Sequence, residues 1–292
     1  MASLKEVRNR IVSVNSTQQI TKAMKMVSAA KLRRAQDAIQ QMRPYASKLA
    51  EMISTVSAQT EAGAENPFTE VREVKRVMII VVTSDRGLCG AFNANVGKAA
   101  MALVQEKYAS LHAAGQVEVL SLGKKGGEYL SRRGYKVNDA HVDIFSRLNF
   151  SNVREIGEFM LNAFMEKQFD VVEILFNYSK NVATQIIQTE QLLPLVAAET
   201  SVKSSAVDYI FEPSEEQIIS ELIPKSIKLS IFRALLESNS SEHGARMTAM
   251  DKATENAGEL IKALKLEYNR SRQAAITKEI LEIVGGAEAL SA

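Results

Sequence analysis

The sequence has almost none of the residues from which metal centres, disulfide scaffolds and large aromatic pockets are built. Its 292 residues include one cysteine, Cys89, no tryptophan, and three histidines that lie far apart, His112, His141 and His243. One cysteine cannot form a disulfide within the chain, and separated histidines do not form a zinc motif. We therefore expect neither a structural metal nor a bound cofactor.

Long apolar runs are also missing. No stretch reaches the roughly 18 apolar residues that a membrane-spanning helix needs. The first residues lead directly into amphipathic sequence, without the apolar segment of a secretory signal. Any membrane association is therefore expected to be peripheral. Only 5 prolines and 14 glycines interrupt the chain, and 46% of its residues are apolar, which is typical of a helix-rich globular protein.

Charge is distributed unevenly along a chain whose net charge is only +2. Residues 1–60 hold ten Lys and Arg against three Asp and Glu, whereas residues 61–224 hold sixteen against twenty-two. The N-terminal segment therefore predicts an acidic partner. A nucleic acid is one such partner, but Tyr45 is the only aromatic residue in this segment, and single-stranded nucleic acids are held by aromatic stacking. We expect no nucleic-acid partner.

The N-terminal 60 residues carry one apolar stripe with helical spacing, which predicts a long helix over residues 1–60. Pro44 is expected to bend or break this helix near Arg43. The predicted stripe consists of Leu4, Val7, Ile11, Val14, Ile20, Met24, Val27, Ala35, Ala38, Met42, Ala46, Leu49, Ile53 and Val56.

A second long helix is predicted over residues 209–286. Ser214 and Gln217 form a helix-start pattern, Pro224 is expected to kink the first turns, and Gly285 with Gly286 to end the helix. Its stripe consists of Ile227, Ile231, Leu235, Ala249, Ala253, Ala257, Leu260, Leu264 and Tyr268. Two such long stripes need partners, so the two terminal helices are predicted to pair as an antiparallel coiled coil.

Between them, residues 70–196 alternate strand and helix patterns, which predicts a Rossmann-like, doubly wound α/β domain. Continuous β-branched runs indicate buried parallel strands. The predicted strands are 76–83, 117–122 and 171–176, the predicted helices are 94–114, 125–133 and 153–168, and residues 184–195 are a candidate edge strand ended by Pro194. Residues 63–69 and 197–205 are interpreted as connectors.

Two glycine-containing turns raise the question of a nucleotide site. Ser84–Gly90 follows the first strand, where a phosphate would bind, and Lys124–Gly127 begins a helix. Neither turn has a phosphate-binding glycine motif, and Asp85 would repel a phosphate. Structural turns are therefore favoured over a nucleotide site. Cys89 is interpreted as a buried thiol rather than a nucleophile, and Asp85 alone does not provide the set of groups that an enzyme needs.

Several segments, in the correct order, resemble the gamma subunit family of bacterial F-type ATP synthases. Leu4–Ile11 and Thr21–Lys31 are similar to the family's N-terminal helix, and Ser84–Gly90 is similar to its central motif. Ala245–Met250 and Tyr268–Ile280 are similar to its C-terminal helix. The resemblance spans essentially the whole chain, and the family's architecture agrees with the one predicted from the residue patterns.

The resemblance implies a non-catalytic rotor shaft that couples proton or sodium flow through a membrane ring to ATP synthesis or hydrolysis at beta subunits. The implied partners are the alpha and beta subunits, the epsilon subunit and the membrane c-ring, with one copy of the chain per complex. The implied location is the cytoplasmic face of the bacterial inner membrane.

The resemblance also implies two sets of contact residues. The positions that match contacts with the beta subunits are Met24, Arg246, Arg272, Gln273 and Thr277. The positions that match a contact with the polar loops of the membrane ring are Tyr209, Phe211 and Glu212. Solvated helix flank is the alternative for the first set, and a plain strand-to-helix junction is the alternative for the second.

Overall fold

The computed structural model describes residues 3–59, 67–181, 184–195 and 215–291. By their internal contacts they form two compact units. The first unit consists of the residues up to Ser28 and those from Met247 onward, and the second is Ala29–Arg246. Helices α1 (Leu4–Gln59) and α6 (Glu215–Ser291) contribute to both units. The predicted connector at residues 197–205 lies outside the described residues.

The second unit is built on a five-stranded sheet with the order β3-β2-β1-β4-β5. The first four strands in this order run parallel, and β5 runs antiparallel to β4 at the edge. The strands are β1 (Val77–Val82), β2 (Val117–Leu122), β3 (Lys136–Asn138), β4 (Val171–Ser179) and β5 (Gln185–Leu193). The predicted α/β fold is confirmed. The three-residue strand β3 was not predicted, because so short a segment carries no alternation.

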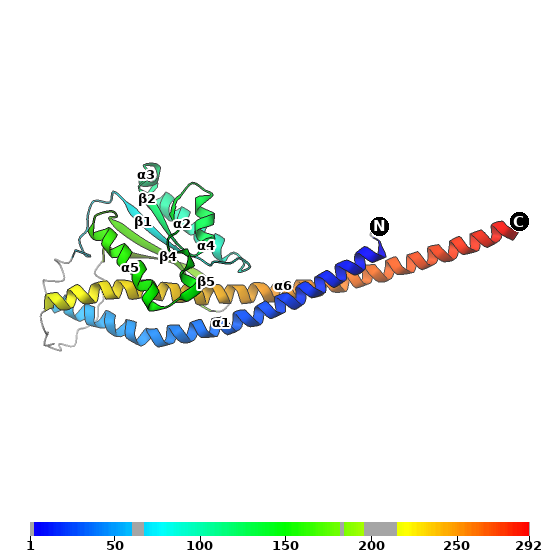
Figure 1. Ribbon diagram of the computed structural model, residues 1–292, viewed down its shortest axis with the longest axis horizontal. Coiled ribbons are helices and arrows are strands. Elements are labelled where there is room, and N and C mark those ends of the chain that lie inside the picture. The colour runs from blue at the N-terminus through cyan, green and yellow to red at the C-terminus, as the bar shows by residue number, and fades with distance from the viewer. Residues whose placement is uncertain (1–2, 60–66, 182–183, 196–214, 292) are drawn as a thin grey trace. The chain divides into compact units, whose positions relative to one another are not determined.

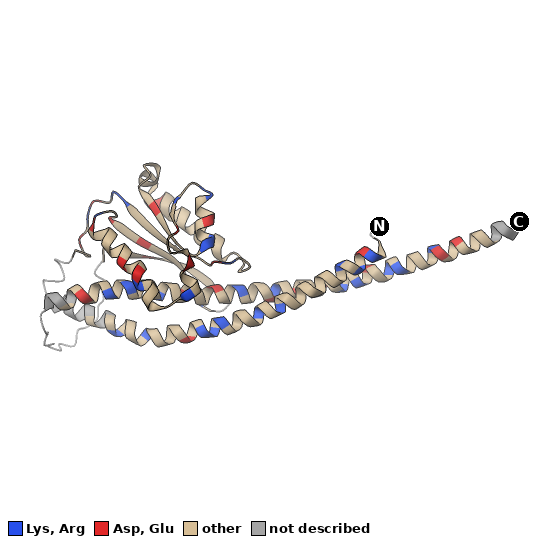
Figure 2. Ribbon diagram, viewed as in Figure 1, with Lys and Arg blue, Asp and Glu red and all other residues tan. Residues whose placement is uncertain are grey.

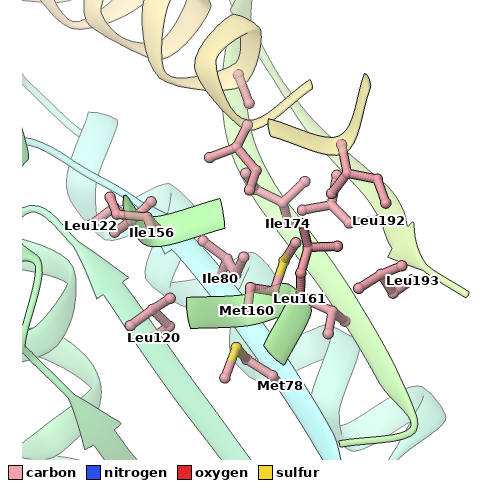
Figure 3. Close-up of a cluster of buried hydrophobic side chains, with 14 of the residues drawn as sticks. Met78, Ile80, Leu120, Leu122, Ile156, Met160, Leu161, Ile174, Leu192 and Leu193 are labelled. Carbon is pink, nitrogen blue, oxygen red and sulfur yellow. The ribbon is translucent and has the colours of Figure 1, made fainter. Parts of the chain in front are cut away.

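Helices cover both faces of this sheet (Figure 1). Alternate residues of β1 point to opposite faces, as the pleat of a strand requires. Val77, Ile79 and Val81 pack against α2, whereas Met78, Ile80 and Val82 pack against α5 and α6. Figure 3 shows part of the apolar cluster on the face of the sheet that α5 and α6 cover. The helices between the strands are α2 (Phe92–Lys107), α3 (Ala109–Ala113), α4 (Lys124–Ser131), the 3-10 helix η2 (Val142–Arg147) and α5 (Phe150–Met165).

Within the second unit, α6 lies between the sheet and α1. Its apolar residues Ile227, Ile231 and Leu235 belong to the sheet's core. On another side, Leu229 and Leu236 pack with residues of α1. The α1 residues of that cluster are Ile39, Met42 and Leu49. The α6 residues up to Leu235 therefore pack on the sheet, and the α1 residues up to Leu49 pack on α6, although the sequence pattern had suggested a boundary between the helices and the α/β domain.

In the first unit, α1 and α6 run antiparallel, as predicted. Gln18 Nε2 donates to the carbonyl oxygen of Thr254 at 3.3 Å, and the hydroxyls of Thr21 and Thr254 are 2.7 Å apart. The Lys25 ammonium lies 2.5 Å from Asp251. Residue numbers thus rise along α1 while those of their partners fall along α6.

The chain does not break at Pro44, and the predicted end of α6 at the two glycines is wrong, whereas a bend at Pro44 and a kink at Pro224 stay predictions. Pro44 and Pro224 both lie inside helices. Pro44 is exposed, as is Gln40 one turn earlier, so water can replace the hydrogen bond that the missing amide would donate. Gly285 and Gly286 do not end α6, which continues to Ser291. Neither glycine has the positive φ of a helix end, and each costs the helix about 1 kcal/mol relative to alanine.

The predicted stripe on α1 is also wrong in part. Ile20 and Val27 are 59% and 57% exposed, whereas their neighbours Thr21 and Ser28 are buried. Apart from the half-buried positions 24 and 38, the buried and half-buried positions of α1 follow alternating steps of three and four: 4, 7, 11, 14, 18, 21, 25, 28, 32, 35, 39, 42, 46 and 49. This is the 3.5-residue period of a left-handed coiled coil.

Candidate functional site

The predicted contact residues of the first unit lie on the surfaces of α1 and α6. Met24 is half-buried, and its carbonyl oxygen accepts a hydrogen bond from the Ser28 hydroxyl at 2.8 Å. Arg272, Gln273 and Thr277 are exposed. The Thr277 hydroxyl donates to the Gln273 carbonyl oxygen at 2.9 Å. The positions of these four residues leave their side chains available to a partner, and their contact with beta subunits stays a prediction.

The residues predicted to contact the membrane ring cannot be placed in the same way. Tyr209, Phe211 and Glu212 lie outside the described residues, as does Ser214 of the predicted helix start. Their roles stay predictions from the resemblance. The described part of α6 begins at Glu215.

Arg246, the remaining predicted contact residue, is 8% exposed and is bonded within its own unit. Its Nη2 donates to the carbonyl oxygens of Arg86 and Gly87, each at 3.2 Å. Its Nη1 pairs with Glu242 one turn earlier on α6. In this chain the guanidinium therefore joins α6 to the loop that follows β1, a geometry that the sequence pattern did not predict.

The loop that receives Arg246 is held by polar bonds of its own. Asn93 Oδ1 accepts from the Ser84 amide at 2.9 Å, and the Ser84 hydroxyl donates to the Arg86 carbonyl oxygen. Leu88 has a φ of +65° and is 64% exposed. A left-handed backbone is unfavourable for leucine, so the surrounding bonds must hold the loop in this conformation.

The two turns considered as nucleotide sites are occupied by the protein's own groups. Asp85 Oδ1 accepts from the Lys124 amide at the start of α4, at 3.2 Å. Gly123 has a φ of +111°, and a Cβ there would lie 2.1 Å from the Thr83 carbonyl oxygen. Asp85 thus takes the place at the helix start where a phosphate would bind, and Gly123 lies against the end of β1. The geometry favours structural turns.

Cys89 is buried, as the sequence interpretation expected. Its sulfur lies 3.3 Å from Asn93 Nδ2 and 3.8 Å from the Ser84 hydroxyl. Burial raises the pKa of the thiol, so the reactive thiolate is disfavoured. Cys89 is therefore a packing residue of the loop.

Arg246 lies beside two titratable side chains whose pKa values are shifted by burial, Glu242 and His243. Burial raises the pKa of Glu242, and the adjacent Arg246 guanidinium partly offsets this rise. Burial lowers the pKa of His243 to about 4, assisted by the cations of Arg246 and Lys31. Near pH 7 the cluster therefore holds one guanidinium beside one uncharged histidine.

The depressed pKa of His243 predicts a loss of stability in acid. The unfolded chain takes up a proton near pH 6.5, whereas the folded chain does so only near pH 4. Stability is therefore full above pH 6.5 and falls as the pH drops toward 4. After allowance for solvent screening, we expect the wild-type chain to lose about 2 kcal/mol more than His243→Gln between pH 7 and 4.5.

Urea unfolding of the two isolated chains, followed by circular dichroism at both pH values, measures this difference. Glu242 titrates in the opposite direction, since its raised pKa favours the folded state in acid. It is present in both chains, so the difference between them reports His243. Equal losses in the two chains would contradict the prediction.

Sequence reasoning also missed the buried polar segment of α6 that ends at Arg246. Five polar residues of residues 237–242 are buried, namely Glu237, Ser238, Ser240, Ser241 and Glu242. The Ser241 hydroxyl donates to the Asn177 carbonyl oxygen at 3.0 Å. The available signal was a run of short polar residues inside a helical pattern, where serine is a weak helix former.

Comparison with known proteins identifies the family. The sequence profile described as ATP synthase matches residues 3–290. An ATP synthase gamma chain from Cytophaga hutchinsonii is 62% identical over 294 residues, covering 100% of both chains. The chain belongs to the ATP synthase gamma chain family. Its role is that of a non-catalytic rotor subunit of an F-type ATP synthase.

Solved structures share the fold of this family member. A chain from the Euglena gracilis mitochondrial ATP synthase has a TM-score of 0.66 at 19% identity, covering 98% of this chain and 94% of that one. A chain from the central stalk and c-ring of the Tetrahymena thermophila mitochondrial enzyme has a TM-score of 0.60 at 24% identity, covering 80% and 99%. The fold of this chain is therefore one that chains of solved ATP synthases share.

The described residues contain neither a membrane-spanning helix nor a metal-binding cluster. None of the helices there combines the length and apolar character that crossing a membrane requires. In the same ranges, no group of three or more His, Cys, Asp and Glu side chains could hold a metal ion.

Proposed function

We propose that the chain is the shaft that couples ion flow through a membrane ring to ATP synthesis or hydrolysis at beta subunits. The exposure of large apolar side chains on both helices of the first unit supports this proposal most strongly. Their exposed fractions run from 40% to 71%: Val12, Ile20, Met26, Val27, Leu260, Leu266, Ile276, Ile280, Leu281, Ile283 and Val284. A helix pair with so many apolar residues outside needs a surrounding protein surface.

Charge supports an acidic surface on that surrounding protein. Figure 2 shows that Lys and Arg predominate along α1, in accord with ten basic against three acidic residues in residues 1–60. Basic and apolar residues together suit a partner that is acidic at some points and apolar at others. We assign that surface to the alpha and beta subunits, with Met24, Arg272, Gln273 and Thr277 as beta-subunit contacts carried by the family resemblance; Arg246, the fifth such position, is buried against its own chain.

The same proposal includes the membrane end of the complex. Tyr209, Phe211 and Glu212 would contact the polar loops of the c-ring, and the epsilon subunit would bind beside them. One copy of the chain would serve each complex, at the cytoplasmic face of the inner membrane. These assignments rest on the family resemblance alone.

Co-purification tests the proposal directly. A tag on the native chain, followed by gentle detergent extraction of membranes and quantitative mass spectrometry, should recover alpha, beta, epsilon and c subunits with one copy of the chain per complex. An untagged strain taken through the same steps is the control. Recovery of the chain without alpha and beta subunits would refute the proposed partners.

A further inference from the structure

We propose that Arg246 is a positioning residue that latches α6 to the loop after β1, so that helix and sheet turn as one piece. The inference rests on the proposed rotary function and concerns only contacts within the second unit. It differs from a role for Arg246 at the surface of a beta subunit, because the partners of its guanidinium belong to the same chain.

α6 is attached to the α/β domain in two different ways along its length. Up to Leu235, α6 is held by apolar residues of the sheet's core. Beyond Leu236, the α6 residues buried in this unit are polar up to Arg246, apart from Gly244. From this last stretch, Ser241 and Arg246 donate hydrogen bonds to the α/β domain. Polar bonds therefore replace apolar packing where α6 leaves the domain.

Hydrogen bonds resist a relative movement of helix and sheet differently from apolar contacts. Apolar contacts are non-directional, so two packed surfaces can shear or rotate past each other at modest cost. Hydrogen bonds weaken steeply when their angle changes. A guanidinium bonded to two successive carbonyl oxygens, Arg86 and Gly87, fixes both the position and the rotation of α6 at that turn. Arg246 is thus suited to carry torque between the helix and the sheet.

The loop after β1 has an unfavourable backbone conformation that depends on surrounding bonds. Leu88 adopts a left-handed backbone, with φ +65°, directly after the two latched carbonyls. The neighbouring Gly90 also has a positive φ, of +62°. A strained segment keeps its conformation only where surrounding bonds impose it. Arg246 supplies such bonds from α6, so the loop's conformation and the helix position depend on each other.

The first test uses the isolated full-length chain, in which no beta subunit is present. Arg246→Met keeps the side chain's length but removes every donor, and Arg246→Lys keeps one cation without the two-pronged geometry. Hydrogen exchange of the loop amides, including those of Ser84 and Phe92, should become about tenfold faster in Arg246→Met. The exchange rate of these amides should rise less in Arg246→Lys.

Arg147→Met provides a matched control, because Arg147 is an exposed arginine of the same unit. Its loop exchange should equal that of the wild-type chain. The double variant Arg246→Met/Glu242→Gln removes the buried carboxylate that a single substitution would leave unpaired, and so keeps the test open if Arg246→Met folds poorly. Unchanged loop exchange in folded Arg246 variants would overturn the latch.

The second test uses the assembled complex. Arg246→Met should lower the number of ions pumped per ATP hydrolysed, while the chain still co-purifies with its partners, and Arg246→Lys should recover part of the loss. A merely structural role would reduce assembly and hydrolysis together and leave the ratio unchanged, which would overturn the inference. Absence of the wild-type chain from the complex would instead refute the proposed function.

Discussion

Complexes that carry Met24→Lys are expected to hydrolyse ATP while pumping fewer ions per ATP. Met24 is a half-buried, neutral thioether beside Lys25, whose ammonium already pairs with Asp251. If Met24 faces the beta subunits, as proposed, a cation added here would bind an acidic loop of a beta subunit in one rotary position. Such a charge-assisted bond contributes about 1 to 3 kcal/mol where it is partly desolvated, and each rotary step would have to break it.

Parallel assays of ATP hydrolysis and ATP-driven ion uptake in membrane vesicles give the ratio that this prediction concerns. Met24→Leu is the matched control, because it changes shape without adding charge and should keep the wild-type ratio. If Met24→Lys also kept that ratio, the face of α1 around residue 24 would not slide past an acidic surface. The orientation of the shaft in its ring would then have to be revised.

The sheet of the second unit could be predicted because its strands carry signals that depend little on their surroundings. β1 is a continuous apolar run and β4 is mostly apolar, with Glu173 and Asn177 buried within it, as expected for strands buried on both faces, and both were found within a few residues of their observed bounds. β5 was predicted as an edge strand, and its mixed polar sequence fits that position. β3 could not be found, since three residues with partial burial have no distinctive pattern.

The heptad register of α1 could not be read from residue types alone. Thr21 and Ser28 occupy buried positions, and their polarity moved the predicted stripe onto Ile20 and Val27, which are exposed. Thr21 is buried because its hydroxyl meets that of Thr254. Whether a residue such as Thr21 is buried is decided by its partner on the other helix. The sequence of α1 alone therefore does not show which of its polar residues are buried. The exposed apolar residues likewise reflect partners outside the chain.

The role of Arg246 was hidden for a similar reason. From the sequence, a basic residue on a helix is interpreted as a solvated or partner-facing cation. The guanidinium of Arg246, however, is buried against carbonyl oxygens some 160 positions earlier in the chain. Backbone carbonyls exist at every residue and leave no mark in the sequence. Only the fold reveals that the loop after β1 presents two of them to α6.

Removal of the residues from Thr277 onward is expected to weaken assembly while leaving the fold of the chain intact. The side chains described from Thr277 to Ala287 are all exposed, so their loss removes few contacts within the chain. It removes four large apolar side chains, Ile280, Leu281, Ile283 and Val284, that are 50% to 71% exposed. If the surrounding ring buries each of them at a gain of about 1 kcal/mol, the affinity should fall about a thousandfold.

The measurement compares two truncated chains with the wild type. One chain ends before Thr277, and the control ends before Ala287 and so keeps all four apolar residues. Thermal unfolding of the isolated chains should be nearly equal, whereas titration with alpha and beta subunits should show weaker assembly only for the shorter chain. Nucleotide binding at the beta subunits should persist in whatever complex forms, because the removed surface is proposed to contact the surrounding subunits and not to bind nucleotide. A shorter chain that assembled normally but abolished nucleotide binding would show that the end of α6 acts on the chemistry itself.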